Sequence, residues 1–227
     1  MLEITASSEW RLAYPGAVIG LLELSGVDNT RPSPQLNQRK RDIEARLRQE
    51  CAGFNRQDFL ALPPVAAYHR YYRSFDKTYH VLLQIESIAL KGKNLPDVSP
   101  LVDANFTAEI GTRVLAAGHN VEQLLPPVWM DIATPDDEFT PMSGATRRIQ
   151  PGDMVMRDAH GVCCTIIYGQ DNLSPITAAT RHALYVAYAP PGVPAETVED
   201  HLRQIEANVR LFAPEAQLEQ RRLLLAG

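Results

Sequence analysis

The stretch PGDMVMRDAHGVCCTIIYGQDN, residues 151–172, holds two short apolar runs with a turn signal between them. The runs at 153–158 and 162–168 have the length and composition of strands, and the DAHG between them favours a tight hairpin turn. Gly169 follows Tyr168 at the end of the second run, where a glycine allows unusual backbone angles or a close ligand approach. The stretch therefore predicts an antiparallel hairpin with a polar end.

Outward from this hairpin, the chain favours helices in its first half and strands in its second half. Apolar residues at steps of three and four predict helices at 35–50, 65–75, 78–91, about 103–117, and 195–212. Short apolar runs bounded by turn residues predict further strands at 16–24, 128–134 and 183–189. We expect residues 215–227 to add a short helix or to fray. This order predicts a single α+β domain rather than a βαβ repeat.

The composition excludes some classes of function. The chain has 227 residues, 45% of them hydrophobic, and a net charge of −5, so no bulk positive field would attract nucleic acid or an anionic membrane. Any RNA contact must come from a local patch. The start of the chain lacks the pattern of a signal peptide, and no run of about 18 apolar residues follows, so we expect a cytoplasmic protein with no membrane partner.

The common motifs of metal and cofactor enzymes are absent from the sequence. There is no Walker loop, GxGxxG, HExxH or GxSxG motif, and the histidines show no ligand spacing. Adjacent Cys163 and Cys164 would face opposite sides of a strand and could not share one ion, and Cys51 lies far away in sequence. We therefore expect neither a metal nor a cofactor, and three reduced thiols.

Two groups of polar residues flank the predicted helix at 103–117. Asp103 and Asn105 at its start either cap free backbone N–H groups or, with those groups, hold a carbonyl or phosphate oxygen. His119 and Asn120 follow its end, where a histidine either complements the helix dipole or serves a pocket as an acid or base.

A third group follows the hairpin. Its side chains either form an ordinary polar loop or contact a ligand beyond the end of a buried strand. The residues are Tyr168, Gly169, Gln170, Asp171 and Asn172. Thr177, Thr180 and Arg181 come next, either as turn residues or as groups suited to carbonyl and phosphate oxygens of a substrate.

Two basic segments are candidates for RNA contact. Residues 31–48 hold six basic side chains, and residues 68–79, YHRYYRSFDKTY, mix basic and aromatic ones. Such segments either form a solvated helix face or neutralise phosphates and stack on unpaired bases. The candidates are Arg39, Lys40, Arg41, Tyr71, Tyr72 and Arg73.

From about Tyr71 to Pro191 the chain resembles the B3/B4 module, the editing region of the phenylalanyl-tRNA synthetase β subunit, which also occurs as freestanding proteins. The resemblance is carried, in order, by YRSFDKTYHVLLQIESIALKGKNLPDVSPLVDANF, AGHNVEQL, PGDMVMRDAHGVCCTIIYGQDN and ITAATRHALYVAYAP. It implies a layered, mixed α/β domain. The domain would have a strand-helix extension at about 1–62, a B3/B4 core at about 63–191 and a C-terminal helix at about 195–222.

The resemblance also implies a role linked to RNA, though not that of a complete synthetase. The module would bind the aminoacylated end of a tRNA or an aminoacyl compound and hydrolyse the mischarged ester in trans, without a metal. His119 or Asp171 would orient water, and Gly169 would let backbone approach the substrate carbonyl. The remaining polar residues named above would line the pocket. Val186 stands where the family has an acidic residue, and this favours an alternative, a non-catalytic module that binds an amino-acid-like ligand or a protein.

Overall fold

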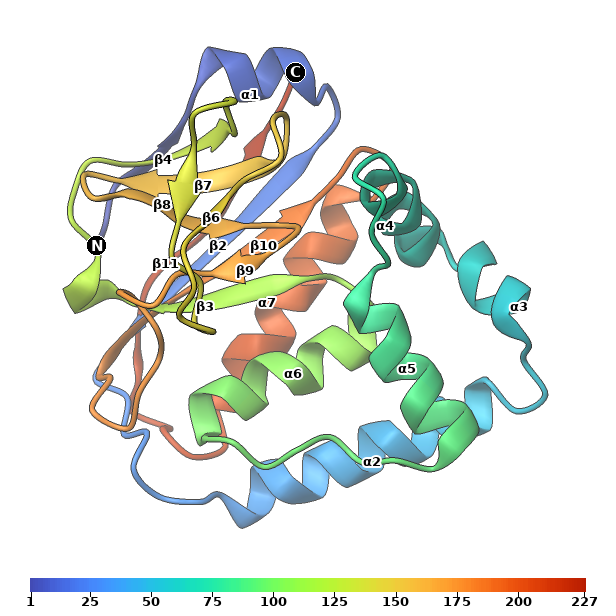
Figure 1. Cartoon of the computed structure of the whole chain (residues 1–227). Helices are drawn as coiled ribbons and strands as arrows, with labels where there is room; N and C mark the ends of the chain where they lie inside the picture. The colour runs from blue at the N-terminus through green and yellow to red at the C-terminus, as the bar shows by residue number, and fades with distance from the viewer.

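Strand β10 (His182–Ala189) is buried at every residue after His182, because it lies in the middle of a four-stranded antiparallel sheet. In the computed structural model, which describes residues 1–227, the strands of this sheet follow the order β11-β2-β10-β3. The other three strands are β2 (Val18–Ser25), β3 (Ala116–Asn120) and β11 (Gln217–Leu225). Strand β3 therefore lies at one edge of this sheet and β11 at the other (Figure 1).

A second sheet contains the predicted hairpin. It has five strands in the order β1-β4-β7-β8-β9, and only β1 and β4 are parallel. These strands are β1 (Ile4–Ala6), β4 (Val128–Ile132), β7 (Met154–Asp158), β8 (Gly161–Thr165) and β9 (Gly169–Gln170). A small two-stranded sheet joins β5 (Glu138–Phe139) to β6 (Arg147–Arg148). Asp158 pairs with Gly161 across the β7–β8 turn, so the hairpin prediction is confirmed.

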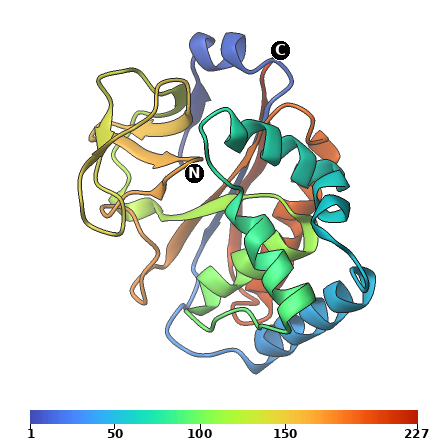
Figure 2. The same ribbon diagram turned by 45° about the vertical axis from the view of Figure 1, so that its right-hand side comes forward.

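Helices cover the side of the four-stranded sheet that faces away from β7 and β8 (Figure 2). The chain contains α1 (Ser8–Ala13), which instead contacts β4 of the second sheet, α2 (Pro34–Glu50), α3 (Arg56–Ala61), α4 (Pro63–Arg73), α5 (His80–Lys91), α6 (Pro100–Thr112) and α7 (Ala195–Arg210), with a 3₁₀ turn η1 (Val121–Gln123). Helix α7 contacts β2 at Gly20, where a Cβ would lie 2.7 Å from Val198 Cγ1. Helix α6 contacts α2, α7 and β3, and nearly all its side chains are buried.

The fold class is confirmed. The chain forms one α+β domain with most helices in its first half, mixed and antiparallel strands in its second half and a helix, α7, near its end. Residues 18–25 pair with β10 in the same sheet, so the expected extension and core share their central sheet. No helix has both the length and the apolar composition needed to cross a bilayer.

Two predicted helix ends are wrong. The helix predicted at 103–117 begins at Pro100 and ends at Thr112, because Arg113 adopts the left-handed conformation at φ 65°. Residues 116–120 form β3 instead, since pairing with β10 outweighs the helix preference of Ala116 and Ala117. Helix α7 ends at Arg210, and the residues expected to be helical or frayed after it form β11, because the edge of β2 offers backbone partners.

Strand β11 forms the outer edge of the four-stranded sheet beside β2. Its pairing shifts between Leu218 and Gln220, which marks an irregularity in the strand. Several charged side chains lie along the strand after Leu218. One of them, Arg221, forms ion pairs with Glu199 and Glu206 of α7. Strand β11 is therefore tied both to β2 and to the helix beneath it.

A buried ion pair joins α2 to the start of α6. Lys40 Nζ lies 2.9 Å from Asp103 Oδ2 and also contacts Asp97 and the Pro96 carbonyl. The Asp103 Oδ1 atom accepts a hydrogen bond from the Val98 N–H at 3.0 Å. The Lys40 side chain is fully buried, so the prediction that Lys40 contacts RNA is wrong, and its charge serves instead to fix α6.

We expect Lys40→Met to lower the free energy of unfolding by about 3–5 kcal/mol, because it leaves the buried Asp103 carboxylate without its counter-charge. Urea denaturation followed by circular dichroism measures this loss. The matched control is Arg39→Met, an exposed position on the same helix, which should change stability by less than about 0.5 kcal/mol. Equal stability of the two variants would contradict this role for Lys40.

Candidate functional site

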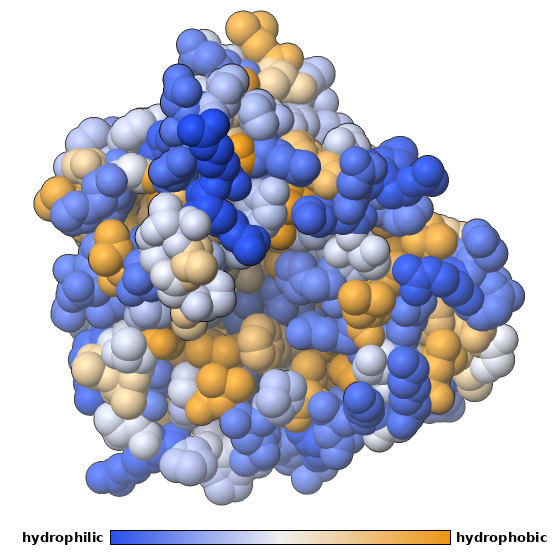
Figure 3. All heavy atoms as spheres, in the orientation of Figure 1, coloured by the Kyte–Doolittle hydropathy of each residue, from blue (hydrophilic) through white to orange (hydrophobic).

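A cavity of about 440 Å³ lies beside the outer edge of β3. Helices α5 and α6 form one side of it, and β8, β9 and the turn between them form the other. The space-filling view shows a hollow in the middle of this face, with strongly hydrophilic side chains above it over the β6 region (Figure 3). The volume of the cavity is within the range of ligand pockets, roughly 300–1,000 Å³.

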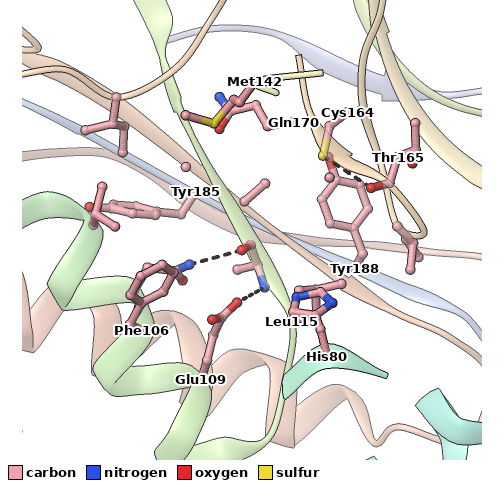
Figure 4. Close-up of a pocket in the computed structure, with 18 of the residues that line it drawn as sticks. His80, Phe106, Glu109, Leu115, Met142, Cys164, Thr165, Gln170, Tyr185 and Tyr188 are labelled. Carbon is pink, nitrogen blue, oxygen red and sulfur yellow. Dashed lines mark hydrogen bonds between the residues drawn. The ribbon is translucent and has the colours of Figure 1, made fainter. Parts of the chain in front are cut away.

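The walls of the cavity are mainly apolar. Tyr185 and Tyr188 of β10 and Phe106 of α6 supply large surfaces, and Ile176 adds another. Figure 4 shows Tyr185 and Tyr188 on opposite sides of β3, so the cavity reaches around the edge of this strand. The Met142 side chain lies at the rim and is 63% exposed. An apolar ligand group would find contacts on several sides.

Strand β3 is an edge strand, and its pairing with β10 determines which of its backbone groups face this cavity. The Tyr188 N–H donates to the Leu115 carbonyl at 3.0 Å, which places residue 115 in contact with β10. Because paired and unpaired residues alternate along an antiparallel strand, Ala116, Gly118 and Asn120 direct their N–H and C=O groups away from β10. Those groups need partners from elsewhere in the chain.

Helix α6 supplies the partners for Ala116. The Asn105 Nδ2 atom donates to the Ala116 carbonyl at 3.0 Å, and the Ala116 N–H donates to Glu109 Oε1 at 3.0 Å (Figure 4). Asn105 and Glu109 are four residues apart, so they lie on the same face of the helix. Their two hydrogen bonds replace the missing neighbouring strand at this point and fix α6 against the sheet.

Glu109 is the one acidic side chain that lines the cavity. Its burial raises the pKa of this carboxyl to about 8, although the Ala116 N–H and the Asn105 side chain favour the ionised form. Glu109 is therefore mainly protonated near neutral pH. Our sequence analysis missed this residue, and the available signal was an acid at i+4 from Asn105 in a helix whose other charged residue is Asp103.

Several buried polar atoms around the cavity have no protein partner. They include the amide oxygens of Asn105 and Gln84 and the hydroxyl of Tyr188. His80 also lines the cavity, with Nδ1 3.3 Å from the Tyr72 hydroxyl, and burial lowers the pKa of its ring. The α5 and α6 side of the cavity thus holds two buried hydrogen-bond acceptors that have no protein partner.

Three of the predicted site residues line this cavity: Asn105, Gly169 and Gln170. Gly169 has a φ of 83°, so the prediction of unusual backbone angles there is confirmed. The side chain of Gln170 is fixed, because its Nε2 donates to the Ser174 carbonyl at 2.9 Å.

The two predicted catalytic residues lie behind Gln170 and do not line the cavity. His119 Nδ1 is 2.8 Å from Ser174 Oγ and 3.1 Å from Gln170 Nε2, and Ser174 Oγ donates to Asp171 Oδ1 at 2.7 Å. Burial lowers the pKa of His119 to about 3, so its ring is neutral. The serine lies between the acid and the histidine, unlike the order of a hydrolase triad. The catalytic roles of His119 and Asp171 stay predictions.

The other predicted ligand contacts also lie outside the cavity. Asn120, on β3 rather than after a helix, accepts a hydrogen bond from the Glu122 N–H at 3.3 Å. Thr180 accepts one from the Thr177 N–H at 2.9 Å, and Arg181 donates to the Thr180 carbonyl. Asp103 is held by Lys40, and Asn172 is exposed.

Tyr168 is placed beside the cavity wall rather than in it. Its ring packs against Phe139 at a centroid distance of 6.4 Å. The Arg147 guanidinium lies 5.0 Å from the ring centroid and the Lys77 ammonium 5.9 Å from it. Two cations therefore lie close to the Tyr168 ring next to Gly169.

The predicted RNA-binding residues separate into exposed and buried ones. Arg39 and Arg73 are exposed and Arg41 is partly so. The hydroxyl of Tyr71 donates to Asp153 at 2.6 Å and that of Tyr72 to the Ile166 carbonyl at 2.8 Å. Because both tyrosine rings are buried in the core, the prediction that they stack on bases is wrong.

The described chain shows no group of three histidine, cysteine, aspartate or glutamate side chains arranged to hold a metal ion. Val186, for which the sequence resemblance implies an acidic counterpart, is fully buried and does not line the cavity. Cys164 does line it, and burial raises the pKa of its thiol to about 12, so this thiol stays protonated.

Neither a scan of protein-family models nor a search of curated proteins gave a match. Among solved structures, the chain is similar to an N-terminal fragment of the phenylalanyl-tRNA synthetase beta subunit from Pyrococcus horikoshii, with a TM-score of 0.49 and 10% identity. The likeness covers 98% of this chain and 56% of that fragment, so this chain spans little more than half of its length. It is a likeness of fold.

We expect Glu109→Gln to flatten the fall of stability with pH. The pKa of Glu109 rises from 4.5 to about 8 on folding, so between these values the native chain holds a proton that the unfolded chain has lost. This contribution is present below the lower value and is lost as pH rises through the higher one. Urea denaturation at several pH values measures the difference between the variant and the unmodified chain.

The control for this experiment is Glu215→Gln at an exposed position, which should keep the unmodified pH profile. Burial also raises the pKa of Asp153 to about 6. This residue adds its own decrease of stability with rising pH, which the unmodified chain and both variants share. A Glu109→Gln profile that coincides with that of the unmodified chain would rule out a protonated, buried Glu109.

Proposed function

We propose that this chain binds an amino-acid-like ligand in the cavity beside β3. The apolar side chain of the ligand contacts Tyr185, Tyr188 and Phe106, and its amino group donates to the amide oxygens of Asn105 and Gln84. The observation that carries the proposal is the combination, in one cavity, of broad apolar walls with buried acceptors that have no protein partner. A buried acceptor without a partner is costly, so a ligand that supplies a donor gains affinity there.

The geometry favours binding over hydrolysis. Ester hydrolysis in trans, which the resemblance implies, requires a group that orients water at the ligand, or the end of the tRNA itself in that role. The one carboxyl at the cavity, Glu109, is mainly protonated near neutral pH and is thus poorly suited as a base. His119 and Asp171 lie behind Gln170.

A specific observation supports the aminoacylated end of a tRNA as the form in which the ligand arrives. Arg147 and Lys77 lie close to the Tyr168 ring next to the cavity wall, where they could contact a phosphate or a base. With a net charge of −5, the chain would bind only a short RNA segment at this patch. All three cysteines are free thiols, which agrees with a cytoplasmic location for this encounter.

Filling the cavity should abolish ligand binding. Val102 lines the cavity from α6 and is half-buried, so Val102→Trp inserts bulk without replacing a core residue. We expect the affinity for the best of L-leucinamide, L-methioninamide and L-phenylalaninamide to fall at least about tenfold. Isothermal titration calorimetry measures it, with Leu90→Trp on the exposed face of α5 as the matched control. Equal binding by the two variants would contradict the proposed site.

The proposal that the ligand arrives on RNA is tested with the same aminoacyl group joined through a stable amide to the 3′ end of a short RNA hairpin. We expect this probe to bind more tightly than the free amino-acid amide, and Arg147→Ala to remove most of the gain, because that arginine lies beside Tyr168. Arg203→Ala, at an exposed position of α7, is the control. If RNA and free amide bind equally, the ligand is not carried by RNA. Release of the amino acid from the corresponding ester RNA would show hydrolysis in addition.

A further inference from the structure

The backbone N–H of Gly118 is an unpaired donor at the edge of β3. On one side of it, Asn105 and Glu109 occupy both backbone groups of Ala116. On the other side, the Asn120 N–H donates to the Ser174 carbonyl at 2.9 Å, and a bridge between His119 and Pro175 brings Ile176 toward the Gly118 carbonyl. No protein acceptor bonds to the Gly118 N–H.

This donor opens toward the cavity. Gly118 lines it together with Ala116 and Ile176, and it is only half-buried. A Cβ at this position would lie 2.5 Å from Ile176 Cδ1 and 3.2 Å from the Tyr185 ring. The absence of a side chain therefore lets the apolar walls close around the exposed backbone group.

Besides the Gly118 N–H, the cavity has side-chain donors in the Tyr188 hydroxyl and the protonated Glu109 carboxyl, but no charged donor. No lysine or arginine lines it. Burial lowers the pKa of His80, which favours the neutral ring, and the Nε2 atom of Gln170 is already bonded to the Ser174 carbonyl. An oxygen acceptor of the ligand that enters beside β3 thus meets the Gly118 N–H as a free backbone donor.

We propose that the Gly118 N–H donates a hydrogen bond to the acyl oxygen of the ligand, either a carboxylate or an ester or amide carbonyl, and so anchors the ligand main chain on the edge of β3. This inference rests on the proposed function and specifies the ligand as an α-aminoacyl unit. Its amino group pairs with the acceptors on α5 and α6, and its acyl oxygen, two carbons away, pairs with the donor on β3. Gly118 is thus a positioning residue for the acyl group.

The test compares two double variants that differ in one backbone N–H. Ile176→Val removes the Cδ1 atom that a side chain at 118 would strike, so Gly118→Ala/Ile176→Val keeps the donor and Gly118→Pro/Ile176→Val lacks it. Proline is tolerated at an edge strand where its nitrogen faces away from the sheet. The probes are L-leucinamide and 3-methylbutylamine, which has the same side chain and amine but no acyl group.

We expect the proline variant to bind L-leucinamide about three to ten times more weakly than the alanine variant, and both variants to bind 3-methylbutylamine equally. Equal affinity of the two variants for L-leucinamide would overturn the role of Gly118, while loss of binding in Val102→Trp would still support the cavity. Absence of binding by the unmodified chain at millimolar L-leucinamide would overturn both proposals.

A measurement on the unmodified chain decides the question if the proline variant does not fold. Amide hydrogen exchange followed by NMR should show the Gly118 N–H slowed when L-leucinamide is added and unchanged with 3-methylbutylamine. The Ala116 and Asn120 amides, which have protein partners, serve as internal references. A Gly118 amide whose exchange does not respond to L-leucinamide would also overturn the inference.

Discussion

The exposed edge of β3 needs hydrogen-bond partners, and the side chains of α6 provide them at Ala116. This requirement explains why a helix carries an amide and a carboxyl on an inward face. The contact between α6 and β3 also buries Glu109 and so raises the pKa of its carboxyl. Two residues along the strand, at Gly118, no α6 side chain bonds to the edge, and this part of the strand lines the cavity.

The position of α6 is fixed from two opposite directions. Asn105 and Glu109 attach it to β3, and Asp103 attaches its first turn to Lys40 of α2. The contact with α2 pairs the opposite charges of Lys40 and Asp103. The contact with β3 uses the Glu109 carboxyl, which carries no charge when it is protonated. The α6 side of the cavity is therefore built on a fixed element, a condition under which a small pocket can hold one ligand geometry.

Local patterns predicted the α+β class, the β7–β8 hairpin, the conformation of Gly169 and most helices, because periodicity and turn residues act over a few positions. Long-range pairing decided the rest. Residues 116–120 and 217–225 became strands because β10 and β2 offered partners. The burial of Lys40, Tyr71 and Tyr72 depended on Asp103, Asp153 and the Ile166 carbonyl, all distant in sequence. Glu109 was missed for the same reason, since its partner Ala116 lies across a turn that the sequence did not reveal.

Strand β11 has a consequence for how copies of this chain behave together. An open strand edge can pair with the same edge of another molecule and begin aggregation. Here that edge carries Glu219, Arg221 and Arg222, and its register is interrupted after Leu218. Burying these charges against a second chain would be costly. The last strand thus completes the sheet and also makes edge-to-edge association of concentrated protein unfavourable.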